Sequence, residues 1–211
     1  MTEPGKFIVL EGIDGAGTTT HLSTVADCIR SYGYKVDVSC EPTRLILGGI
    51  IKSVLNNRIR APPESQLYFA CLFLADRLDH IDIMRQAMQT GAYAVTDRYS
   101  LSSFAYQSLD IKEASGVPLD LLLEMHRPIL KPDLTLFLDI NTEVALARAG
   151  KERTSTELFE TREFLKKVEA QYHEVVKQLR EEYNIITINS DRPREEVAND
   201  ITREVRKLIS K

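Results

Sequence analysis

The chain has 211 residues, enough to bury a substantial core and few enough that a single domain over residues 1–211 is expected. Apolar residues make up 43% of the sequence and charged residues 27%, a balance typical of globular enzymes and unlike that of disordered chains. The formal net charge of -4 gives no overall attraction to nucleic acid or to an anionic membrane, so we expect no nucleic-acid polymer and no membrane as a partner.

Short β-branched runs alternate along the chain with longer helical patterns. The runs predicted as strands are residues 7–10, 36–39, 93–96, 134–138 and 185–188. Residues 65–88 and 163–183 have the apolar spacing of helices. This alternation is typical of a parallel sheet with crossover helices. We therefore predict an α/β fold of three layers, with about five parallel strands and helices on both faces.

A glycine-rich turn follows the first predicted strand, in the sequence FIVLEGIDGAGTTTHL at residues 7–22. A strand, a turn and a helix start in this order are the context in which GxxxxGK[ST] cradles phosphates, because glycine lets backbone N–H groups converge on an anion. Thr19 stands at the [ST] position, whereas Thr18 stands where the pattern has lysine. From these residues alone, the segment could also be a plain turn before a threonine-rich helix N-terminus.

Residues 149–157 are the least regular part of the sequence. They are rich in charge and threonine, poor in apolar residues, and lie between two helical patterns. Such a composition is typical of a mobile surface flap, or LID, which we predict at about residues 149–158. No internal repeat or flexible linker marks a second domain.

The cysteines and the lack of long apolar runs predict a cytoplasmic protein. Cys28, Cys40 and Cys71 are widely spaced and form no CxxC pair, which argues against a disulfide framework and a zinc site. No stretch approaches the roughly 20 apolar residues of a membrane span, and the first twelve residues do not read as a signal peptide.

Further short segments follow the glycine-rich turn in a distinctive order. They are EPT at residues 41–43, FLADR at 73–77, DRYSLSSFAYQ at 97–107, PDLTLFLD at 132–139, and a basic segment that ends in LFE at 158–160. With EGIDGAG at residues 11–17, this series resembles the thymidylate kinases over nearly the whole chain. The resemblance implies a P-loop nucleoside monophosphate kinase that transfers the γ-phosphoryl group of ATP to dTMP, uses Mg2+ as cofactor and forms a homodimer.

On the donor side, the resemblance implies that ATP contacts the turn and two arginines. This set is Gly12, Ile13, Asp14, Gly15, Ala16, Gly17, Thr18, Thr19, Arg148 and Arg192. Thr19 and Asp97 are the implied ligands of Mg2+ and its water shell. Arg148 is expected to stack on the adenine. Helix capping by Ser190 or Asp191 ahead of Pro193 explains the segment around Arg192 equally well.

On the acceptor side, the resemblance implies that Asp14 contacts the sugar 3'-hydroxyl, that Phe73 stacks on the pyrimidine and that Arg77 hydrogen-bonds it. The full implied set for dTMP is Asp14, Glu41, Arg44, Phe73, Arg77, Arg98, Ser102, Tyr106 and Gln107. The four-residue spacing predicts that Phe73 and Arg77 share one helix face. Taken alone, FxxxR would read as a core phenylalanine beside a surface arginine. In the family an arginine frequently precedes the Glu-Pro pair and contacts the acceptor phosphate, whereas this chain has Cys40 at that position. The resemblance therefore implies that this contact is made by Arg44 or is lost.

The residues expected to act in catalysis are Asp14, Asp97, Arg98 and Arg153. Asp97 and Arg98 follow a predicted strand, at the end where open α/β sheets bind ligands, although a structural ion pair would also explain them. The resemblance implies that Arg98 bridges the acceptor phosphate and the transferring group. In the resembled family an arginine lies either in the phosphate turn or in the LID. Since this turn contains none, the resemblance implies that the LID supplies it, and Arg153 is the candidate.

Two other functions stay open on the sequence. One aromatic and one arginine do not encode the methyl group of thymine, so the acceptor could be dUMP, dCMP or a deoxynucleoside. The missing lysine at position 18 would also suit a nucleotide-binding sensor that has lost turnover. Retention of Asp14, Asp97, Arg98 and a basic LID argues against the sensor. Arg98 or a LID cation, Lys151 or Arg153, is the expected substitute for the lysine.

Overall fold

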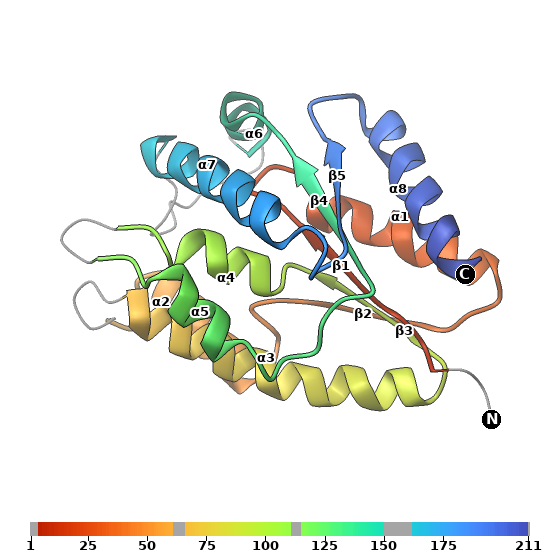
Figure 1. Cartoon of the computed structure of the whole chain (residues 1–211), viewed down its shortest axis with the longest axis horizontal. Coiled ribbons are helices and arrows are strands. Elements are labelled where there is room, and N and C mark those ends of the chain that lie inside the picture. Colours follow the sequence, from red (N-terminus) through yellow and green to blue (C-terminus); the bar gives the residue numbers. More distant parts are fainter. Residues whose placement is uncertain (1–3, 61–65, 111–114, 150–161, 211) are drawn as a thin grey trace.

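The computed structural model describes residues 4–60, 66–110, 115–149 and 162–210. Its centre is one sheet of five strands in the order β2-β3-β1-β4-β5, in which all neighbours are parallel (Figure 1). The strands are β1 (Phe7–Glu11), β2 (Val36–Cys40), β3 (Tyr93–Asp97), β4 (Leu134–Asp139) and β5 (Ile185–Asn189). The predicted α/β fold is confirmed, and each strand extends one residue beyond its predicted carboxyl end.

Eight helices connect or flank these strands within the described residues. They are α1 (Thr18–Ser31), α2 (Ile46–Leu55), α3 (Gln66–Gln89), α4 (Ser100–Tyr106), α5 (Leu119–Met125), α6 (Thr142–Ala149), α7 (Arg162–Leu179) and α8 (Arg194–Ile209). Helix α7 ends earlier than the predicted 163–183. The chain turns there instead, with Asn184 at a φ of 48° and the Ile185 N–H donating to the carbonyl of Arg180 at 2.8 Å.

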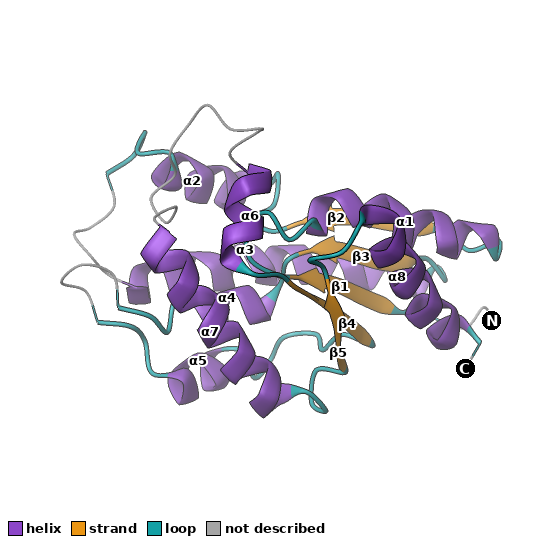
Figure 2. Cartoon of the chain, turned by 90° about the horizontal axis from the view of Figure 1, so that it is seen from above, coloured by secondary structure: helices purple, strands orange, loops and turns teal. Residues whose placement is uncertain are grey.

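Helices cover both faces of the sheet, as predicted (Figure 2). Along β1, Phe7 and Val9 pack with Ile81 and Met84 of α3. The intervening residues of β1, Ile8 and Leu10, belong to the larger core cluster, which includes apolar side chains of α1, α4, α7 and α8. This burial of both faces explains why β1 is apolar at successive positions instead of alternating.

The carboxyl ends of the strands all point to one edge of the sheet, because every neighbouring pair is parallel. The turn after β1, the loop after β2 and the charged residues that end β3 therefore meet at that edge. Within the described ranges, every helix is too short or too polar to cross a lipid bilayer.

Candidate active site

The turn between β1 and α1 has the geometry of an anion cradle. Gly15 and Gly17 have φ angles of 88° and 94°, a region that favours glycine. A Cβ atom on Gly15 would lie only 2.5 Å from the carbonyl oxygen of Ala145 in α6, so a side chain is excluded there. Helix α1 begins at Thr18, directly after the turn, and its first N–H groups and positive dipole end face the same region. The backbone can therefore bind phosphate without any side chain.

The two threonines at the start of α1 have different surroundings. Thr18 is 6% exposed, so this turn presents a small buried hydroxyl where a lysine is usual. Thr19 is exposed, and its hydroxyl donates a hydrogen bond to Oδ2 of Asp97 at the end of β3. The structure thus brings into hydrogen-bond contact the two residues that were expected to hold Mg2+.

Asp97 offers an unused ligand atom beside that pair. Its Oδ1 is buried and has no hydrogen-bond partner among the described residues. A buried carboxylate oxygen without a partner is costly and calls for a cation or a donor. Mg2+ is commonly held by one or two carboxylates together with substrate phosphates, so Asp97 and the Thr19 hydroxyl fit this ion. In the described part of the chain, no three His, Cys, Asp or Glu side chains gather into a metal cage of their own.

Arg98 gathers the residues expected to surround the acceptor. It has a φ of 65° directly after β3, and its backbone N–H donates to the carbonyl of Leu10 at 2.8 Å. Its guanidinium donates to Asp14 Oδ1 at 2.5 Å and to Ser102 Oγ at 3.4 Å, and lies 5.6 Å from the centre of the Tyr106 ring. The arginine therefore joins the phosphate turn to α4.

A buried carboxylate that the sequence analysis missed lies beneath this group. Glu11 ends β1 and is fully buried. It accepts hydrogen bonds from the N–H of Tyr99 at 2.9 Å, from the N–H and hydroxyl of Ser102 at 3.2 and 2.6 Å, and from the Tyr172 hydroxyl at 3.1 Å. Burial raises the pKa of the Glu11 carboxyl, while the hydrogen bonds from Ser102 and Tyr172 and the charge of Arg98 oppose that rise. Glu11 thus ties β1 to the start of α4 and to α7.

Replacing Glu11 by alanine is expected to lower the free energy of unfolding by about 2–4 kcal/mol, because two buried N–H groups lose their acceptor. Urea unfolding followed by circular dichroism would measure the change. Glu11→Gln keeps one side-chain oxygen for the two N–H groups and should lose less than Glu11→Ala. Exposed Glu174→Ala is the control and should unfold like the wild type. Equal stability of Glu11→Ala and the wild type would contradict this assignment.

The loop after β2 is held by two neighbouring residues of α3. Asp76 accepts hydrogen bonds from the N–H and the hydroxyl of Thr43 at 2.8 and 2.5 Å. The Nε of Arg77 donates to Oε2 of Glu41 at 2.9 Å. The backbone N–H of Glu41 donates to the carbonyl of Asp97 at 2.9 Å, which fixes the start of the loop beside β3. The loop is therefore positioned mainly by buried side chains.

Arg77 differs from the simpler reading of the FxxxR spacing. It is 1% exposed, so it is not the surface arginine of the simpler alternative. Its N–H groups make hydrogen bonds with Glu41 Oε2, Ser103 Oγ, His126 Nε2 and the carbonyl of Tyr99, and Nη2 also lies 2.7 Å from Glu41 Oε2. In this conformation the guanidinium is therefore held mainly by groups of the protein itself. The buried carboxylate of Glu41 explains why the arginine turns inward.

The other expected acceptor residues have varied surroundings. Phe73 is half-buried and Arg44 is exposed. Gln107 is buried, and its Oε1 atom, like the hydroxyl of Tyr106, has no hydrogen-bond partner within the described residues. These two polar atoms lie on neighbouring residues at the end of α4, next to the Arg98 group, and can serve a ligand.

The expected adenine side is formed by the ends of α6 and β5. Arg148 in α6 donates to the carbonyl of Arg192 at 3.4 Å, so the two predicted arginines lie together. Arg192 also pairs with Asp200, and the hydroxyl of Ser190 donates to the carbonyl of Ala16 in the turn at 2.7 Å. Arg153 and LID residues 150–158 lie outside the described residues.

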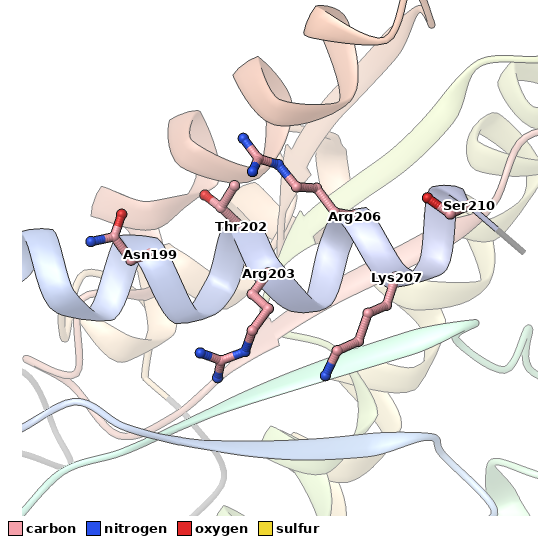
Figure 3. Close-up of a pocket in the computed structure, with 6 residues that line it drawn as sticks. All are labelled: Asn199, Thr202, Arg203, Arg206, Lys207 and Ser210. Carbon is pink, nitrogen blue, oxygen red and sulfur yellow. The ribbon is translucent and has the colours of Figure 1, made fainter.

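A further hollow lies on α8 (Figure 3). It is lined by Asn199, Thr202, Arg203, Arg206, Lys207 and Ser210. Lys6, which precedes β1, donates to the carbonyl of Leu208 at 2.7 Å, so this part of α8 lies at the opposite end of β1 from the turn. Arg203 and Lys207 are already paired with Glu204. The hollow therefore adds nothing to the phosphate site.

A parallel sheet with a phosphate turn after its central strand and charged residues at the end of the neighbouring strand defines a P-loop kinase fold. The chain belongs to the thymidylate kinase family, whose sequence model matches residues 10–201. It is 36% identical to a probable thymidylate kinase of Archaeoglobus fulgidus, over 97% of this chain and 96% of the relative. The probable thymidylate kinase of Methanococcus aeolicus is 35% identical, with 98% and 97% covered. The thymidylate kinase of Brachyspira hyodysenteriae is 35% identical over 78% of each chain.

Proposed function

We propose that this protein transfers the γ-phosphoryl group of ATP to dTMP, giving dTDP and ADP, and so serves dTTP synthesis. Membership of the thymidylate kinase family supports this function. The structural observation that carries the proposal is the convergence of Arg98, Asp14, Ser102 and Tyr106 beside the phosphate turn. The enzyme is thus a nucleoside monophosphate kinase.

Phosphoryl transfer requires alignment and charge neutralisation more than a side-chain nucleophile. The backbone of residues 15–19 binds the donor phosphates, and Arg98 binds the transferring group. Asp14, which Arg98 orients, accepts a hydrogen bond from the acceptor sugar, and Phe73 stacks on the base. Thr19 and Asp97 would hold Mg2+, which supplies positive charge to the donor phosphates when bound. Arg148 and Arg192 border the adenine, and Arg153 of the LID completes the positive charge.

Release of ADP from the purified protein, measured with ATP and Mg2+, tests the function. The acceptors compared are dTMP, dUMP, dCMP, thymidine and no acceptor. Fast release with dTMP alone is the expected result. Faster ADP release with another acceptor would assign the protein to a kinase of that acceptor. No ADP release with any acceptor, despite nucleotide binding, would favour the nucleotide-binding sensor.

Thr18→Lys is expected to raise kcat less than tenfold. An uncompensated loss of one preorganised cation would lower kcat about 10²- to 10³-fold. A small gain in Thr18→Lys would therefore mean that Arg98 or a LID cation already supplies the charge of the missing lysine. Steady-state kinetics with dTMP would measure kcat for Thr18→Lys, the wild type and the control Thr20→Lys, whose side chain is exposed on the same helix. A gain of several orders of magnitude for Thr18→Lys would refute compensation.

The homodimer is proposed to form through one face of α3. Leu67 and Leu78 are 48% and 45% exposed, and Cys71 between them is also exposed. Spacings of four and seven residues put all three on one side of the helix. Exposed apolar side chains in a row favour burial against a second copy. Sedimentation should find a dimer for the wild type and for Ile83→Glu, and a monomer for Leu78→Glu; a wild-type monomer would contradict the proposal.

A further inference from the structure

His126, the residue after α5, is fully buried against Arg77. Its Nε2 atom lies 2.6 Å from Nη1 of Arg77, and its Nδ1 atom lies 2.7 Å from the carbonyl oxygen of Leu122. A guanidinium can only donate hydrogen bonds, so Nε2 must accept one. The single proton of the ring is therefore on Nδ1 and donates to Leu122. The contacts specify a neutral imidazole in one tautomer.

The histidine completes a cage around the Arg77 guanidinium. Glu41 binds one side of the group, while His126, Ser103 and the carbonyl of Tyr99 bind the remaining N–H groups. These partners come from the loop after β2, from α4 and its N-cap residue, and from the residue after α5. The plane of the guanidinium is consequently fixed by three separate segments, and loss of one acceptor leaves a buried donor unpaired.

The cage acts on the loop that leads to the acceptor site. Glu41 is held by Arg77 on one side and by Nδ1 of His80, 3.0 Å from its other oxygen, on the other. The backbone of Glu41 is bound to Asp97, and Arg44 follows three residues later with an exposed side chain. A shift of Arg77 would therefore displace the loop relative to Asp97.

We propose that His126 is a positioning residue for the acceptor nucleotide, which fixes the Arg77–Glu41 pair and through it the loop of residues 41–44. The inference rests on the proposed function, since it assigns the loop to dTMP binding.

The charges around His126 agree with a ring that stays neutral. Burial, followed by the neighbouring charge of Arg77, lowers the pKa of His126 to about 3, while the Leu122 carbonyl opposes the shift. The ring of Phe104 packs edge-on at 5.0 Å and adds no charge. Beyond Arg77, the titratable groups of the cluster are Glu41, His80 and Tyr99. Between pH 5 and 8 the acceptor at Nε2 is therefore retained.

The test compares His126→Leu, His126→Gln and the exposed neighbour Arg127→Gln in steady-state assays that vary dTMP and ATP separately. His126→Leu should raise the KM for dTMP about tenfold and leave kcat and the KM for ATP within about threefold. The side-chain oxygen of glutamine can take the place of Nε2, so His126→Gln should return the KM for dTMP to within about threefold of the wild type. Arg127→Gln should match the wild type. A merely unstable protein would instead lower the apparent kcat and leave both KM values unchanged.

A spectroscopic readout tests the arrangement without catalysis. Long-range 1H–15N spectra of the protein labelled in histidine should show one ring protonated only at Nδ1 from pH 8 to pH 5, and His126→Gln should remove that signal. Titration of this ring near pH 6.5, or a proton on Nε2, would overturn the inference. An unchanged KM for dTMP in His126→Leu would overturn it as well. If the wild type does not phosphorylate dTMP at all, the proposed function fails and the acceptor role of His126 fails with it.

Discussion

Replacing Arg98 by methionine is expected to lower kcat with dTMP by about 10²- to 10³-fold, which corresponds to ~3 to 4 kcal/mol of lost transition-state stabilisation. Arg98 extends from the carboxyl end of β3 into the group formed by Asp14, Ser102 and Tyr106. A cation that is already oriented by its neighbours needs no reorganisation when charge develops on the transferring group. Its removal should therefore reduce turnover more than it weakens substrate binding.

Arg98→Lys separates charge from geometry. Lysine keeps the positive charge but lacks the planar fork that can bind Asp14 and a phosphate together, so we expect an intermediate kcat. Steady-state kcat and the KM values of both substrates should be measured for the two variants. Arg85→Met is the control, because Arg85 is exposed on α3, and its kcat should equal that of the wild type. A loss below tenfold for Arg98→Met would show that another cation performs this role.

Asp97→Asn is expected to lower kcat about 10²-fold and to raise the Mg2+ concentration needed for half-maximal activity. The substitution keeps the shape of the side chain but replaces a charged oxygen ligand by an amide. Oδ1 of Asp97 is buried with no hydrogen-bond partner in the described residues, and Oδ2 accepts a hydrogen bond from Thr19. Loss of the negative charge therefore weakens the cation site while the fold is retained.

The measurement is the dependence of kcat on Mg2+ at a fixed ATP concentration. Thr19→Val, which removes the hydroxyl, should shift this dependence in the same direction, whereas Thr19→Ser should not. Asp79→Asn, at an exposed position of α3, serves as the control. An Asp97→Asn protein with an unchanged Mg2+ dependence would remove Asp97 from the metal site.

The strands were predictable because local sequence determines them. Continuous apolar runs such as residues 7–10 are bounded by turn-forming residues, and burial on both faces of the sheet requires that composition. The end of α7 was less predictable. Tyr183 continues the apolar spacing of the helix, but it is buried in the turn before β5, where Asn184 takes a left-handed conformation.

The residues of the candidate site likewise divide into those that could be named from the sequence and those that could not. Asp97 and Arg98 could be placed from the sequence because they follow a strand end where a parallel sheet binds ligands, whereas Asp14 and Ser102 were named through the family resemblance. Glu11 and His126 could not, because their partners come from distant segments: Tyr172 for Glu11, and Arg77 for His126. A charged residue at the end of an apolar strand was the only local signal for Glu11.

The case of Arg77 shows the limit of helical spacing. The four-residue interval correctly relates Arg77 to Phe73 along α3, but it carries no information about which group the arginine reaches. That choice depends on Glu41, from the loop after β2, which is buried and needs a cationic partner. Base contact by Arg77 was implied by family resemblance alone.

The strand order has a consequence for how the chain folds. β1 is made first, yet both of its partners come much later: Phe7 pairs with Ala94 in β3, and Ile8 pairs with Leu134 in β4. Large loops must close before either pairing gains any free energy, so folding should be slow for a chain of this length. During synthesis, β1 would remain an unpaired apolar strand until β3 has emerged, and it is the segment most exposed to aggregation at that stage.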